Sequence, residues 1–166
     1  MDKAQKITIA VFAALICLAL VALIIVAVWR GNNTQGSFEA PEFDPSAVSG
    51  TPENVDENSR YNSLNLGDAY TVSMCSILTL NNGSVDLYFT SPEVNTVWLS
   101  ASIYDKQGNL LGETGLVKPG EYVKSVKLST PPTASTEVVL KIRSYEPETY
   151  YSRGTASGIV YINVPQ

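Results

Sequence analysis

The chain begins with a long apolar segment, continues with a polar stretch, and ends in short segments of alternating apolar and polar residues. The first segment, Ile7 to Trp29, contains no charged residue. As an α-helix rising about 1.5 Å per residue it would be roughly 35 Å long, which is enough to cross a hydrocarbon core of about 30 Å. We therefore predict one N-terminal transmembrane helix over residues 7–29.

A cleaved secretion signal is the alternative interpretation of this apolar segment. Such a signal has a shorter apolar region, of about 7 to 15 residues, followed by a small-x-small cleavage site. The segment here is longer and ends in Trp29-Arg30-Gly31 without such a site. The pattern therefore favours an uncleaved signal anchor, with Trp29 and Arg30 at the outer boundary of the membrane.

The basic residues on either side of the apolar segment predict its orientation. Lys3 and Lys6 precede it, and Arg30 alone follows it closely. Because the side richer in lysine and arginine stays in the cytoplasm, residues 1–6 form a cytoplasmic stub. The lipid bilayer contacts residues 7–29, and the rest of the chain is expected to be extracellular.

Residues 30–66 follow the anchor and show no sustained apolar period. They are rich in Gly, Pro, Ser, Asn and acidic residues. A segment of this composition buries too little apolar surface to fold alone, so we predict a flexible acidic linker. Its scattered aromatic residues, Phe38, Phe43 and Tyr61, are interpreted as incidental rather than as docking anchors.

Residues 67–166 alternate between apolar and polar positions and predict about seven β-strands. Turn residues separate these segments, at Asn82-Gly83, at Asp105 to Asn109 and at Lys118 to Gly120. The expected strands lie at 69–80, 85–90, 96–104, 110–111, 122–128, 137–145 and 155–164. The apolar side chains expected to face the core are Val72, Met74, Leu78, Leu80, Val85, Leu87, Phe89, Val97, Leu99, Ala101, Ile103, Tyr122, Val126, Leu128, Val138, Leu140, Ile142, Val160, Ile162 and Val164.

The number and length of these strands fit an all-β fold, an immunoglobulin-like or fibronectin-III-like β-sandwich. The cysteine pair around a core tryptophan that marks true immunoglobulin domains is absent from the sequence, so only the architecture carries over. A pilin-like α/β subunit is the alternative fold. It fits less well, because Gly31 and the prolines that follow would end the long helix of a pilin at the membrane.

The layout also resembles a group of bacterial surface proteins. The segment Gly112-Glu113-Thr114-Gly115-Leu116-Val117-Lys118-Pro119-Gly120, with the strand that follows from Tyr122, is similar to small single-pass surface proteins of Gram-positive (Firmicutes) bacteria. The resemblance covers the anchor and most of the predicted sandwich. It implies an exported, outward-facing domain and brings no catalytic residue with it.

Composition removes several classes of function. The net charge of −5 argues against a nucleic-acid partner, and the absence of histidine removes the usual general base of hydrolases and the commonest zinc ligand. Cys17 lies in the membrane segment and Cys75 in a strand, so they cannot form a disulfide within one chain, and Cys75 is interpreted as a small buried hydrophobe. We predict no enzyme activity, no cofactor and no metal. Calcium at Asp105 to Asn109 with Glu113 is conceivable, but a hairpin turn is the preferred interpretation.

One loop between two predicted strands has the composition of a recognition surface. It contains Tyr145, Tyr150, Tyr151 and Arg153 within a few residues. Aromatic and arginine side chains dominate the energetics of protein interfaces, so these four are the candidate partner-binding residues. The alternative is that Tyr150 or Tyr151 folds back onto the edge of the sandwich.

These expectations combine into one functional hypothesis. The protein would be a membrane-tethered extracellular β-sandwich with a binding or structural accessory role at the cell surface and no catalysis. Its partner would be a protein or a component of the cell envelope. The alternative is a subunit of a multi-protein envelope assembly, such as a secretion, conjugation or adhesion apparatus.

Overall fold

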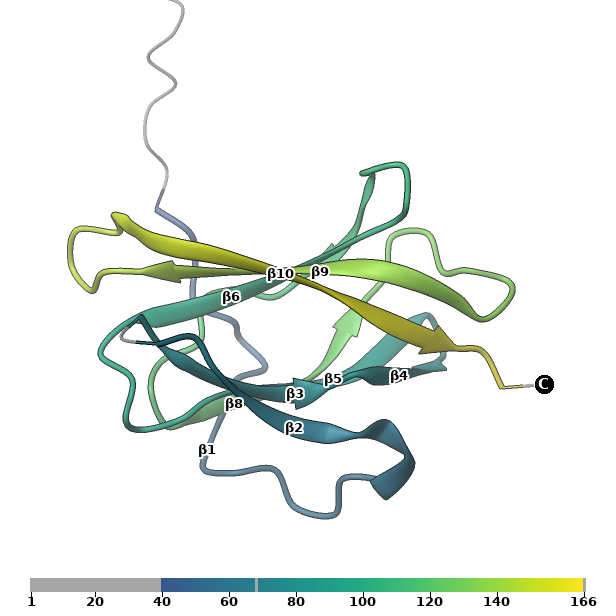
Figure 1. The fold of residues 1–166 in the computed structure, drawn as a ribbon, viewed down its shortest axis with the longest axis horizontal. Coiled ribbons are helices and arrows are strands. Elements are labelled where there is room, and N and C mark those ends of the chain that lie inside the picture. The colour runs from purple at the N-terminus through teal and green to yellow at the C-terminus, as the bar shows by residue number, and fades with distance from the viewer. Residues whose placement is uncertain (1–39, 68, 166) are drawn as a thin grey trace, which may run out of the picture. The chain divides into compact units, whose positions relative to one another are not determined.

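The computed structural model of the chain describes residues 40–67 and 69–165, which belong to one compact unit beginning at Ala40. Within these residues the fold is all-β, with ten strands and one short 3-10 helix (Figure 1). The elements are β1 (Val48–Ser49), η1 (Glu57–Ser59), β2 (Tyr61–Asn65), β3 (Thr71–Cys75), β4 (Ile77–Asn81), β5 (Ser84–Ser91), β6 (Trp98–Tyr104), β7 (Leu110–Glu113), β8 (Glu121–Lys127), β9 (Thr136–Tyr145) and β10 (Ser152–Asn163).

The predicted membrane segment cannot be compared with this structure. Residues 7–29 and the flanking Lys3, Lys6, Trp29 and Arg30 lie outside the described residues. Among the residues that are described, no helix has the length and apolar character needed to cross a bilayer.

The strands form one curled sheet that folds into two facing layers (Figure 1). One layer has the order β4-β10-β9-β6-β7 and the other the order β2-β3-β5-β8-β1. Every pair is antiparallel except β4 with β10, which run parallel. The apolar faces of the two layers meet in a single core, which is why long strands such as β6 and β9 alternate in polarity.

The core consists largely of the side chains that the alternation predicted. Val97, Leu99, Ala101 and Ile103 of the β6 region are all buried, whereas Trp98 and Ser100 between them are only partly covered. The same alternation holds in β9 and in the last third of β10. The period-two pattern therefore identified the inward face of the longest strands correctly.

The inward residues of β8 differ from the prediction. Tyr122 was expected to face the core, but Val123 is the buried residue, together with Val126 and Leu128. The cause lies in the partner strand β5, where Tyr88 has a φ of +50° and the register with β8 shifts. A bulge of this kind breaks the strict alternation that the prediction assumed.

Residues 69–80 were expected to form one strand, and they form two. The chain leaves β3 at Ser76, whose carbonyl accepts a 3.0 Å hydrogen bond from the backbone N–H of Tyr161 on β10. The first half of β4 then pairs with β10 and its second half with β5, so this strand joins the two layers. The hairpin that follows is the predicted one, since Asn82 and Gly83 both have positive φ.

The start of the domain also has to be corrected. Residues 40–66, predicted to belong to the linker, are part of the compact unit. β1 pairs with β8, β2 pairs with β3 along its whole length, and the hydroxyl of Tyr61 donates a 2.8 Å hydrogen bond to Oγ1 of Thr90. Periodicity does not detect such short strands, because residues distant in sequence stabilise them.

Candidate functional site

The candidate binding residues lie around the hairpin that joins β9 to β10. Its loop closes with a 2.9 Å hydrogen bond from the N–H of Glu146 to the carbonyl of Tyr151, and a 3.0 Å bond from the N–H of Tyr150 to the carbonyl of Glu146. Glu148 and Tyr150 both have positive φ, of +69° and +57°. The loop is thus a tight turn with a defined backbone, and this fixes the directions of its tyrosine side chains.

Tyr150 is turned back toward the sheet. Its ring packs edge-on against the indole of Trp98 at a centroid distance of 5.2 Å and an angle of 62°. Phe43 also packs edge-on against this indole, with a centroid distance of 4.8 Å and an angle of 76°. These three residues form an aromatic group that we call the Trp98 cluster.

Phe43 reaches this position because its segment is held on the strand-like stretch after β7. The Asp44 carboxylate accepts a 2.9 Å hydrogen bond from the N–H of Gly115, and its own N–H donates to the carbonyl of Leu116 at 2.9 Å. A Cβ at Gly115 would lie 2.5 Å from the backbone nitrogen of Asp44. A glycine at position 115 is thus required for this close approach between the two segments.

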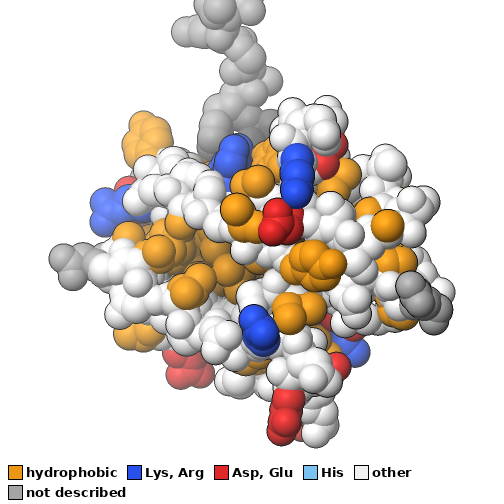
Figure 2. Space-filling model, turned by 45° about the vertical axis from the view of Figure 1, so that its right-hand side comes forward, with side chains coloured by type: hydrophobic (Ala, Val, Ile, Leu, Met, Phe, Trp, Pro, Cys, Tyr) orange, Lys and Arg blue, Asp and Glu red, His pale blue; other side chains and the backbone are white. Residues whose placement is uncertain are grey.

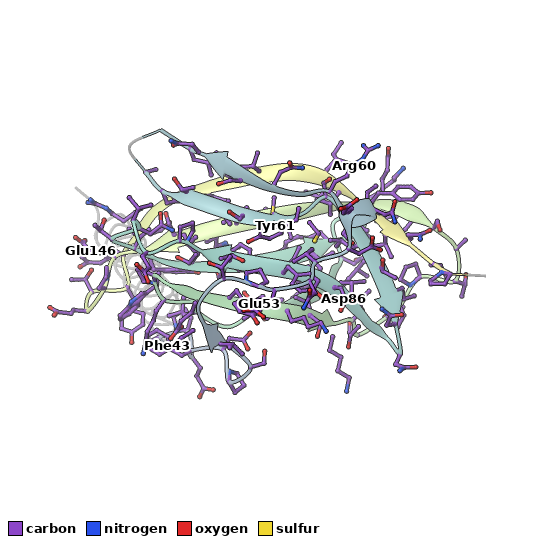
Figure 3. The ribbon with its side chains drawn as sticks, turned by 90° about the horizontal axis from the view of Figure 1, so that it is seen from below. Phe43, Glu53, Arg60, Tyr61, Asp86 and Glu146 are labelled. Carbon is purple, nitrogen blue, oxygen red and sulfur yellow. The ribbon has the colours of Figure 1, made fainter. Side chains whose placement is uncertain are left out.

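A lysine side chain lies against the Phe43 ring of the Trp98 cluster. The ammonium group of Lys118 lies 4.5 Å from the centre of the Phe43 ring. Phe43 and Glu146, which come from opposite ends of the domain sequence, lie at the same end of the molecule (Figure 3). The Trp98 cluster and Lys118 therefore bring together the start of the domain, β6, the segment after β7 and the hairpin loop.

Tyr145 lies beside the cluster. It pairs with Trp98 across β9 and β6, so the two side chains share the outer face of the sheet. Next along this face is a groove of about 370 Å³, to which Tyr145 and Arg143 both contribute. The groove is lined by Pro41, Glu42, Ser100, Ser102, Glu113, Thr114, Gly115, Arg143 and Tyr145.

Tyr151 and Arg153 point into solvent. Tyr151 is 73% exposed, and Arg153 is exposed as well. Within the part of the chain that the structure describes, the one ion pair joins Lys106 to Glu137, so neither Arg143 nor Arg153 has an acidic partner there. On the face shown in Figure 2, charged side chains are scattered among apolar and uncharged ones.

The other residues considered for chemistry have structural roles. Cys75 is fully buried, and burial raises the pKa of its thiol to about 11, so it is a poor nucleophile. The Asp105 carboxylate is occupied by hydrogen bonds from the Asn109 side chain and from the backbone of Gln107 and Asn109, which lower its pKa. No group of three or more metal-ligating side chains occurs among the described residues.

The structure separates the four predicted binding residues into two kinds. Tyr150 belongs to the Trp98 cluster and helps to hold the loop, as the alternative interpretation allowed for one of the tyrosines. Tyr145, Tyr151 and Arg153 are available at the surface around it. Trp98, Phe43 and Arg143 were not predicted to belong to the site. The one sequence signal that could have indicated them is a tryptophan at an outward position of a predicted strand.

Comparison with known proteins gives no further guide to the site. The sequence matches no protein family and has no significantly similar curated relative. The case for function therefore rests on the geometry of this surface.

Proposed function

We propose that this protein is a membrane-tethered, outward-facing binding domain that recognises a protein or envelope component at the cell surface without catalysing a reaction. The surface formed by Tyr145, Tyr151, Arg143 and Arg153 around the Trp98 cluster is the binding site. No cofactor or metal takes part in the proposed role.

The observation that supports this proposal most is the combination of a rigid aromatic base with solvent-exposed Tyr151 and unpaired arginines. Tyrosine loses little side-chain entropy when it binds, and tyrosine and arginine together supply much of the energy of protein interfaces. A side chain as large as Tyr151 at 73% exposure gains by being covered. The packing of Tyr150 on Trp98 holds the loop in place before a partner arrives, which lowers the cost of association.

The same proposal assigns the all-β domain to a more specific type of fold. Two facing layers of mostly antiparallel strands, with the last long strand parallel to an early one, support an immunoglobulin-like or fibronectin-III-like sandwich. Such folds are common scaffolds for recognition, but the fold alone carries no function. The surface around Trp98 gives the reason for assigning one.

The membrane location rests on the sequence. The uncharged segment from Ile7 to Trp29 supports a signal anchor, and Lys3 and Lys6 support a cytoplasmic N-terminus. Protease added to intact protoplasts should then remove the domain from the cells. Protection of the domain until the membrane is opened would contradict the proposed orientation. The resemblance to Firmicutes surface proteins suggests the host for this experiment.

The binding role is tested by photocrosslinking with the full chain in cells. A photoreactive phenylalanine analogue replaces Tyr151 in one variant and Lys124, an exposed residue of β8 in the other layer, in a control variant. The Tyr151 variant should give a discrete crosslinked product that disappears when Arg153→Ala is added, and the Lys124 variant should not. Equal products from both positions, or none from Tyr151, would contradict the proposal.

A further inference from the structure

Part of the edge of β10 has no neighbouring strand within the described domain. β9 pairs with β10 from Ser152 to Ile162, whereas β4 pairs with the opposite edge only from Tyr161 to Asn163. The stretch from Ser152 to Val160 therefore has a partner on one edge only. This unpaired stretch of β10 is much longer than the edge strand β7 at the other end of its layer, which has four residues.

The direction of the backbone groups along this stretch follows from its neighbours. The N–H of Tyr161 points toward β4, because it donates to the carbonyl of Ser76 at 3.0 Å. Backbone groups alternate in direction along a strand. The N–H and C=O groups of Thr155, Ser157 and Ile159 therefore point to the same edge, beyond the start of β4. These groups recur at every second residue, which is the spacing that pairing with a further strand requires.

The part of this stretch from Thr155 to Ile159 lacks the features that usually protect a sheet edge. From Thr155 to Ile159 it contains neither proline nor a charged residue. Natural edge strands are commonly protected by lysine, proline, bulges or short length. The register irregularity of β10, between Ser152 and Gly154, and the charged Arg153 both lie before Thr155. A Cβ at Gly158 would meet nothing within 4 Å, so there is open space over the inward face of the strand at this position.

The opposite layer extends past this edge. β3 and the second half of β4 pair with the same edge of β5, so β3, its outer neighbour β2 and the unpaired stretch of β10 are on one side of the domain. Figure 1 views the domain from this side, with β10 crossing in front of β6 and β2 in front of β8. Beside the unpaired stretch of β10, the second layer thus has a strand, β2, without a counterpart in the first.

The uncovered strand β2 carries an apolar residue on its inward face. Leu64 pairs with Val72, which is fully buried in the core, so the two side chains point the same way. Leu64 is nevertheless 45% exposed. The difference arises because β4 pairs with β10 only from Tyr161 onward, so no strand lies beyond the unpaired stretch of β10 to cover Leu64.

A second residue at this edge also lacks a partner. Tyr70 is only 6% exposed, and its hydroxyl has no hydrogen bond from or to any described residue. Burial raises the pKa of this hydroxyl, and the backbone of Ala156 on β10, whose contact with the hydroxyl does not have hydrogen-bond geometry, partly offsets the rise. Buried hydroxyls are normally paired, so Tyr70 marks a place where the structure has an unmet donor.

We propose that the edge of β10 from Thr155 to Ile159 binds an extended segment of a partner polypeptide as an additional strand. Its backbone would pair with Thr155, Ser157 and Ile159, and its inward side chains would be apolar and would cover Leu64. A second copy of β10 fits this role poorly, because its inward residues, Gly154, Ala156 and Gly158, are too small to cover a leucine. The binding mode is β-strand addition, in which backbone hydrogen bonds give affinity and alternate side chains give specificity.

The test uses the full chain in detergent micelles and a synthetic probe. The probe is a fluorescein-labelled heptapeptide of alternating threonine and valine with a lysine at each end, and fluorescence anisotropy measures its binding. A matched peptide carries N-methyl groups on the amides that would face β10, and another carries them on the intervening amides. The first should bind at least ten times more weakly than the unmethylated probe, and the second should bind about as well.

Two protein variants complete the test. Ser157→Pro removes the central N–H of the free edge without removing a bond to β9, and should weaken probe binding about tenfold or more. Lys124→Val changes an exposed residue of β8, in the other layer, and should leave binding unchanged. Absence of probe binding, or equal binding of all three peptides, would overturn the proposal. A concentration-dependent dimer of the full chain that Ser157→Pro abolishes would assign the edge to a second copy instead, and would also overturn it.

Discussion

The ring of Tyr150 packs against the indole of Trp98 with a centroid distance of 5.2 Å and an interplanar angle of 62°. Edge-on aromatic pairs of this kind contribute about 0.5–1.5 kcal/mol beyond the burial of their surface. The contact connects the hairpin loop to the outer face of β6. It makes Tyr150 part of the fold and leaves the neighbouring Tyr151 for recognition.

The two neighbouring tyrosines should consequently respond differently to mutation. Tyr150→Ala should lower the free energy of unfolding by about 1–2 kcal/mol, and Tyr151→Ala should change it by less than about 0.5 kcal/mol. Urea denaturation of the two variants measures both effects. In a double-mutant cycle with Trp98→Ala, Tyr150 should show a coupling energy of about 0.5–1.5 kcal/mol. A coupling energy near zero would mean that the ring contact does not hold the loop.

Gly115→Ala tests the close approach of the segment that carries Phe43. The added methyl group would meet the backbone of Asp44 at 2.5 Å, so one of the two segments must move. We expect a loss of about 1–3 kcal/mol in the free energy of unfolding. Gly158→Ala is the matched control, because its Cβ would meet nothing within 4 Å. Equal stability of the two variants would show that Phe43 is not held by this contact.

The loop at Asp105 should make stability depend on pH. Hydrogen bonds from the Asn109 side chain and from backbone amides lower the pKa of this carboxyl in the folded state. The stabilisation is therefore present above the unfolded pKa of about 3.9 and is lost as the pH falls through the lower folded value. Asp105→Ala should reduce the melting temperature at pH 7, and the difference from the wild type should shrink near pH 2. A difference that stays constant over this range would contradict the role of the ionised carboxylate.

Cys75 should resist modification in the folded protein. Its thiol is buried and its pKa is raised to about 11, mainly by desolvation. In a Cys17→Ser background, iodoacetamide at pH 8 should label Cys75 slowly in buffer and rapidly in urea, as mass spectrometry would show. Since the raised pKa favours the neutral thiol, its contribution to stability is full below about pH 9 and is lost as the pH rises toward 11. Rapid labelling of the folded chain would place Cys75 at the surface.

The corrected domain boundary predicts the behaviour of two fragments. Residues 40–166 should unfold cooperatively in urea, because they contain every strand of the two layers. Residues 67–166 lack β1 and β2, so the loss of the β2–β3 pairing exposes the edge of β3. The shorter fragment should have a lower free energy of unfolding by several kcal/mol, or should fail to fold. Equal stability of the two fragments would place the start of the domain near residue 67, where the sequence pattern predicted it.

Alternation along the sequence was sufficient to predict the all-β class and most of the inward side chains. The run from Val97 to Ile103 shows why, since a pleated strand between a core and solvent repeats every two residues. The same rule failed at Tyr122, where a bulge in the partner strand changes which side chain faces the core. It also gave no sign that β4 changes layers, because pairing partners are not encoded in the local period.

The site was predictable in part for the same reason. The composition of the hairpin loop identified Tyr151 and Arg153 as surface residues, and the structure places both in solvent. Phe43 could not be assigned, because its packing on Trp98 depends on the contact between Asp44 and Gly115, which are far apart in sequence. Contacts of this kind follow from the tertiary fold and leave no periodic signal.

The most direct test of the proposed function compares affinities for the partner that is crosslinked through position 151. Isothermal titration of that partner with the full-length protein would be carried out for the wild type and for the double variant Tyr151→Ala/Arg153→Ala. We expect the double variant to bind more weakly by a factor of about 30 or more, with a melting temperature within about 2 °C of that of the wild type. Unchanged affinity in a folded double variant would contradict the claim that the domain binds through the surface around Trp98.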